Sequence, residues 1–304
     1  MAQNTCVIVG HDDTIKWEKD GKLHCLHIQR DDTPLNPRTD WDNITIMACW
    51  HRRYDLGDKI EDKEPEDFWK RLVRENLSEE EILQAVVEGK CPGIRVAQNS
   101  EDFKLVDIYA TSRIETPLGS SEASEDLEYE GVFAESAAYY MGNLFTIQHC
   151  MALLADKLEC LPLWLYDHSG ITMSCGARVY PYNDQWDSSQ VGWIVALKDT
   201  IIKECCATEE NWREKAQGIM KADVEVYDQY LTDESYGYTM YEADPPEDPD
   251  NTPDWEEGDS VWGFFGDDLL KNGIAAEVDI IDILTSGDYE MGTATRNTYT
   301  VVTF

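Results

Sequence analysis

The chain has 304 residues, of which 42% are hydrophobic and 11% aromatic, so it can bury one large core or two modest ones and lacks the composition of a disordered chain. Its 61 acidic residues against 25 basic ones leave a formal net charge of −36. That charge disfavours direct binding to nucleic acid, which depends on Lys and Arg neutralising phosphates, and it equally disfavours an anionic membrane surface.

Nine cysteines at irregular spacing differ from the disulfide framework of a small secreted domain. The first thirteen residues have no basic segment ahead of an apolar one, as a signal peptide would. No window approaches the roughly eighteen consecutive apolar residues of a membrane span. We therefore expect an intracellular protein with reduced thiols.

The first 90 residues predict strands and then helices. Pro65–Asn76 has proline in its first turn and apolar residues on one side, which is typical of a helix. Ser78 and Glu81 form a capping box that begins a second helix, and this helix is expected to end near Gly89. Runs rich in Val, Ile and aromatic residues predict strands at Thr5–Val9, Leu23–Gln29 and Ile44–Trp50.

Residues 91–160 are expected to be an insertion that contains a long helix. The pattern predicts a strand at Phe103–Tyr109, an acidic, serine-rich loop at Gly119–Glu130 and one mainly apolar helix over Ala134–Glu159. The remaining part, 161–304, is expected to form a C-terminal α+β region.

In that C-terminal part, Glu209–Leu231 is predicted to be a helix, and the last helix is expected to begin with Asp267 as N-cap and to end before Gly287. Four prolines and many acids predict an extended loop at 244–259. Strands are predicted at Leu163–Tyr166, Val191–Leu197, Tyr236–Tyr241, Ser260–Phe265 and Tyr299–Phe304. The fold class is α+β: mixed, short-stranded sheets with helices, an inserted helical segment and acidic loops.

The run from Tyr166 to Gly170 contains the residue types of a Ser–His–Asp triad. In a strand, Asp167 and Ser169 would share one face and His168 would point to the other. The histidine of a triad must contact both partners, so this spacing argues against a triad. We predict a strand followed by a polar turn, and no catalytic residue.

Two Cys-x-His pairs, Cys25 with His27 and Cys49 with His51, fall in predicted strands, where residues two apart share a face. If those strands were neighbours, the four side chains could bind zinc. The alternative is two buried thiols and two histidines at strand ends, and we favour it. We therefore expect neither a metal nor another cofactor.

Several aromatic residues lie within an acidic segment, Ala222–Leu270, that holds sixteen acids and no Lys or Arg. Tyr and Trp are frequent in binding hot spots, and acids around them suit a basic partner protein. The alternative is core packing beneath a solvated acidic face. The candidate partner-binding residues are Tyr227, Tyr230, Tyr236, Tyr238, Asp248, Asp250, Trp255, Glu256 and Glu257.

Several blocks resemble a family of proteins found in bacteriophages and other mobile elements. These blocks are Trp41–Asn43, Cys49–Asp58, Leu163–Ile171, Trp186–Trp193, Tyr227–Thr232 and Trp262–Gly266. Size and acidity make the chain most similar to the phage-encoded Gabija anti-defence proteins within that family. Cys91–Cys150 departs from the shorter relatives and looks inserted.

This resemblance implies an inhibitor without catalysis in the host bacterial cytoplasm. Such an inhibitor would bind the host nuclease–helicase defence complex as an oligomer and block its binding and cleavage of DNA. Two other functions stay open. One is an acidic DNA mimic that occupies a basic groove, and the other is a hydrolase or metalloenzyme that acts on a defence signal through His51, His168 or the Cys/His pairs.

Overall fold

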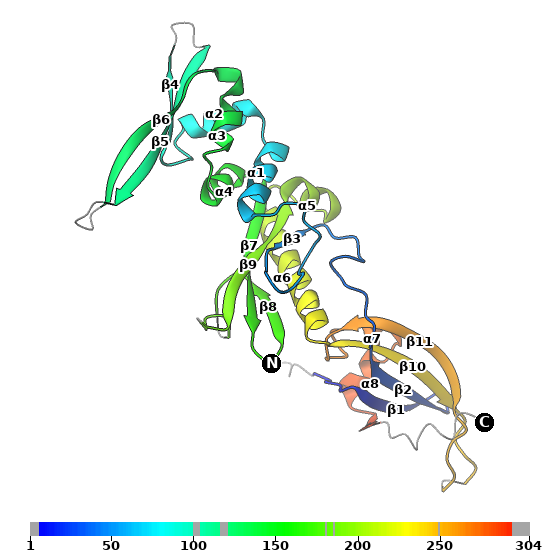
Figure 1. Ribbon diagram of the computed structural model, residues 1–304. Helices are drawn as coiled ribbons and strands as arrows, with labels where there is room; N and C mark the ends of the chain where they lie inside the picture. Colours follow the sequence, from blue (N-terminus) through cyan, green and yellow to red (C-terminus); the bar gives the residue numbers. More distant parts are fainter. Residues whose placement is uncertain are drawn as a thin grey trace. The chain divides into compact units, whose positions relative to one another are not determined.

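The computed structural model describes residues 6–99, 104–115, 121–179, 181–184, 186–248 and 250–293. Within them the predicted α+β class is confirmed: eight α-helices accompany twelve strands in three antiparallel sheets (Figure 1). None of the helices in this part of the chain is long and apolar enough to cross a lipid bilayer.

The chain divides into two compact units, and neither is continuous in sequence. Unit 1 comprises residues 1–42, 164–189 and 221–304, and unit 2 comprises residues 43–163 and 190–220. The division falls within β7 (Leu158–Asp167), β9 (Ser188–Leu197) and α6 (Trp212–Leu231). The sequence predicted a different division, into the segments 1–90, 91–160 and 161–304. That division stays a prediction.

Unit 1 contains a five-stranded antiparallel sheet in the order β11-β10-β2-β1-β12. Asp20 and Gly21 both have positive φ at the turn between β1 and β2, as a tight hairpin requires. The sheet packs on α7 (Ile274–Glu277) and α8 (Ile281–Ser286) around a core that includes Ile15, Leu26, Ile28, Leu269 and Leu284 (Figure 1). The strands are β1 (Asp12–Lys19), β2 (Lys22–Arg30), β10 (Ser235–Ala243), β11 (Glu256–Phe265) and β12 (Glu290–Thr293).

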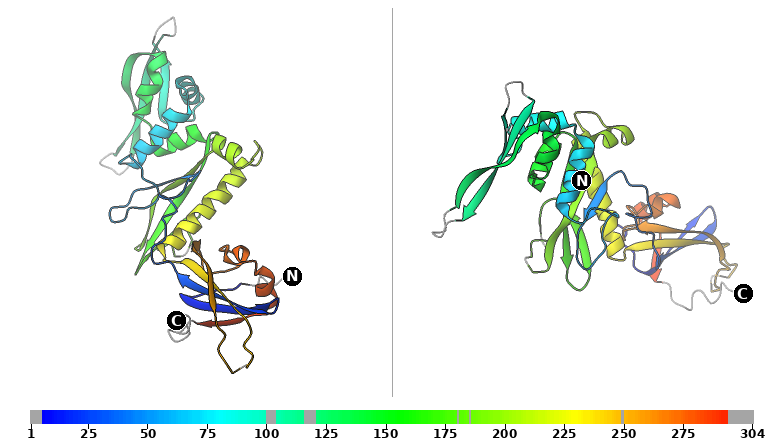
Figure 2. Two further views of the ribbon diagram at one scale, coloured as in Figure 1. Left: turned by 90° about the vertical axis from the view of Figure 1, so that its right-hand side faces the viewer. Right: turned by 45° about the horizontal axis from the view of Figure 1, so that its top comes forward.

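The core of unit 2 lies among four helices: α1 (Pro65–Asn76), α2 (Glu79–Val87), α3 (Ala137–Gly142) and α4 (Ile147–Leu154). Its three-stranded sheet has the order β4-β5-β6, with β4 at Ile94–Gln98, β5 at Leu105–Glu115 and β6 at Ser121–Phe133. The hairpin of β5 and β6 extends away from α2 and α3 (Figure 2).

The third sheet has four strands in the order β3-β9-β7-β8, where β3 is Ile46–Cys49 and β8 is Ile171–Cys175. The short helix α5 (Lys198–Glu204) follows β9 directly. Along α6 the buried residues recur every three or four positions, which is the apolar stripe of an amphipathic helix. These residues are Trp212, Ala216, Met220, Val224 and Tyr227.

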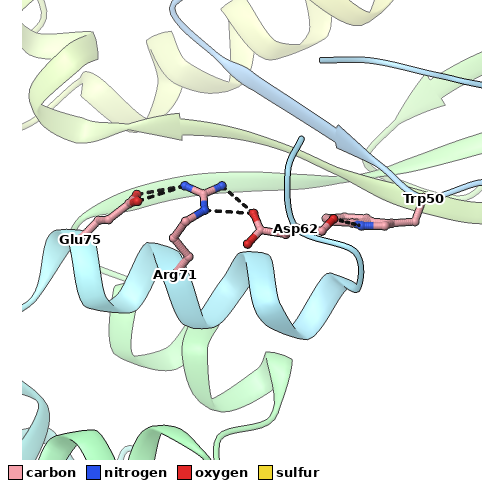
Figure 3. A network of polar contacts seen from close by, with 4 residues as sticks. All are labelled: Trp50, Asp62, Arg71 and Glu75. Atoms are coloured by element: carbon pink, nitrogen blue, oxygen red, sulfur yellow. Dashed lines mark hydrogen bonds and ion pairs between the residues drawn. The ribbon is translucent and has the colours of Figure 1, made fainter. Parts of the chain in front are cut away.

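Trp50 and Asp62 hold the Cys49–Asp58 block against α1 in unit 2 (Figure 3). The Trp50 indole N–H donates to the Asp62 carbonyl at 3.0 Å, and the Asp62 carboxylate accepts two hydrogen bonds from Arg71 at 2.8 and 3.0 Å. Arg71 also pairs with Glu75 one helical turn later. The Trp50 ring packs edge-on against Phe68, so this block has a structural role.

The predicted single helix over Ala134–Glu159 is wrong. A short 3-10 turn and α3 end near Gly142, α4 begins at Ile147, and β7 begins at Leu158. The first helix ends at Gly142, because Gly is a weak helix former. The second helix begins with a new capping box, in which the Thr146 hydroxyl accepts a hydrogen bond from the His149 N–H at 3.3 Å. Apolar periodicity alone did not reveal this break.

The acidic loop predicted at Gly119–Glu130 is also wrong from Ser121 onward, because that stretch belongs to β6. Residues 116–120 lie outside the described residues. Pairing with β5 overrides the weak strand propensity of its Glu, Asp and Ser residues. The loop predicted at 244–259 is wrong from Glu256 onward, because β11 begins at that residue.

At the N-terminus, Thr5 lies outside the described residues, and Cys6–Val9 form only an isolated bridge between Ile8 and Asp268 instead of the predicted strand.

Asp267 is not an N-cap, because α7 begins seven residues later, whereas Gly287 does end α8, with φ of 82°. The pattern missed β1, β4, β8 and β12. Pro65–Asn76 and the capping box of Ser78 are confirmed, and Tyr299–Phe304 lies outside the described part of the chain.

Candidate partner-binding surface

Most of the candidate tyrosines lie in the core of unit 1. Tyr227, Tyr236 and Tyr238 expose 1%, 4% and 3% of their surface. Tyr230 is half-buried and stacks on Tyr227 with ring centroids 5.9 Å apart. These four side chains therefore pack the interior, which was the alternative to partner binding, and a partner could not reach the three buried rings without unfolding.

The candidate acids are exposed. Asp248 and Asp250 lie in the segment that joins β10 to β11, and Glu256 and Glu257 begin β11, the edge strand of the sheet. Trp255 is half-buried just before this strand. The acidic half of the prediction thus remains available to a partner.

Two exposed tryptophans from separate motif blocks lie beside grooves in unit 1 that are lined by other acids than these candidates. Trp41 is 44% exposed and Trp262 is 47% exposed. The Trp41 ring packs edge-on against Phe265, with centroids 5.5 Å apart. Grooves of about 500 and 580 Å³ both contain Trp41, Gly263 and Phe265 in their walls. We call Trp41, Trp262 and these two grooves the acidic–aromatic surface.

A buried arginine fixes the segment that carries Trp41. Arg38 is 5% exposed, and its guanidinium pairs with the Asp223 carboxylate of α6 at 3.4 Å. A compact turn precedes Trp41, in which the Arg38 and Asp40 N–H groups donate to the Asn36 side chain and carbonyl, each at 2.9 Å. The ion pair and the turn therefore connect the segment that precedes Trp41 to α6 and to itself.

Gly237 fixes the position of Trp262. These residues are paired across β10 and β11, and a Cβ at position 237 would overlap the indole, since even the ring Cγ would be only 2.9 Å away. The indole therefore lies flat over the glycine and keeps nearly half of its surface in solvent. Glycine inside a strand marks a close approach of this kind.

The acidic–aromatic surface is negatively charged. Five carboxylates and two basic side chains line its grooves. The basic side chains have acidic partners within unit 1, since Lys271 pairs with Asp268 at 3.0 Å and Arg30 with Asp233. Burial and the nearby carboxylates of Asp267 and Asp228 raise the pKa of Glu234, as expected in a negative field. A cationic group of a partner would be attracted here.

The two Cys-x-His pairs belong to different sheets, with Cys25 and His27 on β2 and Cys49 on β3. Nowhere in the described ranges do three or more His, Cys, Asp or Glu side chains come together to hold a metal ion. Burial raises the pKa of Cys25 to about 11, His27 contacts the Asp12 carboxylate at 2.5 Å, and His51 stacks on Tyr54. These environments are those of packed side chains.

The segment around His168 forms a strand and a turn, as predicted. β7 ends at Asp167, and Ser169 has a φ of 61° in the turn that follows. The His168 Nδ1 atom lies 3.0 Å from the carboxylate of Asp187, not from Asp167. Asp167, His168 and Ser169 therefore form no triad among themselves.

Sequence reasoning did not select Trp41 or Trp262 as candidate contact residues, although both lie in motif blocks. One available signal was Gly237 inside the predicted strand Tyr236–Tyr241, because such a glycine indicates an aromatic ring packed over the backbone. Nothing local linked Trp41 to that strand, since about 200 residues separate them in the chain. Comparison of the chain with protein-family models, curated proteins and solved structures found no match.

Proposed function

We propose that this chain is a phage inhibitor of a bacterial anti-phage defence system and that it acts by binding, without catalysis. Its proposed partner is the Gabija nuclease–helicase complex, whose DNA binding and cleavage it would block as a homo-oligomer in the host cytoplasm. The observation that carries the proposal is the meeting of the Trp41–Asn43 and Trp262–Gly266 blocks at exposed rings beside acid-lined grooves.

The chemistry of this surface suits a protein that binds DNA. Such a protein presents Lys and Arg to the phosphates, so an acidic surface attracts the same residues. Partly exposed tryptophans add the apolar area that hot spots depend on. Charge then accelerates the encounter, while Trp41 and Trp262 provide contacts that salt does not screen.

The test of this surface is a pair of matched charge reversals. Asp32→Lys/Glu225→Lys alters one exposed acid in the wall of each groove, and Glu128→Lys/Glu130→Lys makes the same change in net charge on β6. We expect the first variant to reduce co-purification with the immobilised defence complex by roughly 10-fold and the second much less. Equal losses would show that only total charge matters and would remove this surface from the proposal.

Binding without catalysis has its own test. His51→Ala/His168→Ala removes the two histidines that an enzymatic mechanism would use, and both lie on exposed or half-buried turns outside the cores. We expect the variant to protect DNA from cleavage by the defence complex as well as the unmodified chain does. Loss of protection in a variant with unchanged thermal unfolding would contradict the proposal.

A second candidate function is a DNA mimic that acts by charge alone. The run of exposed acids on the edge strand β11, Glu256, Glu257 and Asp259, favours it. A mimic loses affinity steeply as salt screens its charges, whereas a surface with tryptophan contacts retains affinity at roughly 0.5 M salt. Affinity measured across a salt series separates the two functions.

A further inference from the structure

A separate pocket of about 450 Å³ lies in unit 1, apart from the two grooves beside Trp41. Its aromatic walls are Trp17 on β1, Trp255 before β11 and Tyr289 before β12. Trp17 is buried and stacks on His24 with ring centroids 5.3 Å apart and planes 12° apart, so its ring is held in one orientation. Segments distant in sequence thus build one aromatic enclosure.

The rim of this pocket is acidic. Glu18, Asp288 and Glu290 are exposed and line it, and among the described residues that line it Lys16 is the only Lys or Arg. Lys16 stands opposite Glu290 in the register of β1 and β12. Three carboxylates against one ammonium leave the pocket with a negative charge, which favours a cationic ligand.

The Trp255 ring already faces a cation. The Lys16 ammonium lies 5.8 Å from the ring centroid, within the roughly 6 Å range of a cation–π contact. Aromatic faces surrounded by carboxylates are the chemistry that recognises organic cations in proteins. The volume also lies within the roughly 300–1,000 Å³ range of ligand pockets.

We propose that this pocket binds an arginine side chain of the partner protein. A planar guanidinium can stack on an indole while it donates paired hydrogen bonds to a carboxylate, and it sheds water more readily than an ammonium. The assignment rests on the proposed function only in taking the arginine from a partner protein. The pocket's preference for guanidinium is a property of the isolated chain and can be measured on it.

The experiment follows the indole N–H resonances of the whole chain by NMR while the monovalent probe N-acetylarginine methylamide is added at about 0.15 M salt. The matched citrulline derivative keeps the shape of the probe and removes its charge. We expect saturable shifts of the Trp17 and Trp255 resonances with the arginine probe alone. The Trp186 resonance, from a ring that is 85% exposed and does not line the pocket, should not move.

Two variants then locate the site. Trp255→Ala should weaken binding of the probe by roughly 10-fold, whereas Trp186→Ala should not change it. Equal shifts with the citrulline derivative, equal shifts of Trp186, or unchanged affinity of Trp255→Ala would each overturn the proposal. Tighter binding of spermidine than of the arginine probe would also overturn it, because the ligand would then be a free polyamine.

Failure of the pocket and failure of the proposed function give different results. If the chain binds the arginine probe but does not co-purify with the defence complex, the partner assigned above is wrong and the preference of the pocket stands. If the chain co-purifies with the defence complex and the complex retains Trp255→Ala and Trp186→Ala equally, the arginine assignment is wrong. The proposed function then stands.

Discussion

The contact between Trp262 and Gly237 supplies a test in which the sign of a stability change reverses. Gly237 has an ordinary backbone conformation in β10, so alanine there is hindered by the indole and not by φ. The three atoms nearest to an added Cβ all belong to Trp262. Gly237→Ala therefore perturbs one side chain, and Trp262→Ala removes the obstacle.

The magnitude follows from the overlap. Carbon atoms prefer a separation of roughly 3.5–4.0 Å, and an added Cβ would lie 2.9 Å from the Trp262 Cγ and closer still to two other ring atoms. Overpacking of this kind costs about 1–3 kcal/mol. Without the ring, alanine restricts the unfolded chain more than glycine does, which stabilises the fold by about 0.4–1 kcal/mol.

The assay is urea unfolding of the four members of the cycle: the unmodified chain, each single variant and the double variant. We expect Gly237→Ala to destabilise the fold when Trp262 is present and to be neutral or stabilising when position 262 is alanine, with a coupling of about 2 kcal/mol. The same cost in both backgrounds would refute the placement of Trp262 over Gly237, and with it the exposed ring of the acidic–aromatic surface.

Three other predictions concern stability. Gly192→Ala should cost about 3 kcal/mol in urea unfolding, because its Cβ would meet the backbone of Ala48 and Cys49 at 2.9 Å, and a strand backbone cannot move aside as a ring can. A smaller cost than that of Gly237→Ala would contradict this prediction. Ser78→Ala should cost about 1 kcal/mol of unfolding free energy, because it removes the cap of α2. Ser136→Ala is the control and should cost little, because Ser136 is an N-cap without a side-chain hydrogen bond. Similar costs for the two variants would count against the capping box. Burial raises the pKa of Asp228, so its stabilising contribution is present below the unfolded pKa and is lost as pH rises through the folded pKa. Asp228→Asn should therefore gain stability relative to the unmodified chain as pH rises above about 4, the ordinary pKa of Asp, and a difference independent of pH would refute that reasoning.

Local signals were sufficient for some elements. Proline in the first turn predicted Pro65–Asn76, and the capping box of Ser78 predicted the start of α2, because each depends on residues within one helical turn. The helix over Ala134–Glu159 failed because apolar periodicity continued across Gly142 while the capping box of Thr146 went unrecognised. Local sequence therefore predicts helices well when their ends are considered together with their faces.

Strand pairing across long separations could not be predicted. Thr14 pairs with Gly292 in the register of β1 and β12, and the sequence contains no local sign of that contact. The same limit applies to the candidate site. The candidate acids are exposed, but the candidate tyrosines on β10 are buried, because the face that a strand residue occupies depends on which elements cover the sheet.

The measurement that tests the central claim most directly is co-purification of the chain with the Gabija complex at low salt and at roughly 0.5 M salt, with the mass of the product determined by light scattering. At the higher salt, charges are screened over roughly 4 Å, so a complex that persists depends on shape and apolar contact. We predict a stable complex of high mass in both buffers. Absence of a complex in both would contradict the claim that this chain inhibits that defence system by binding it.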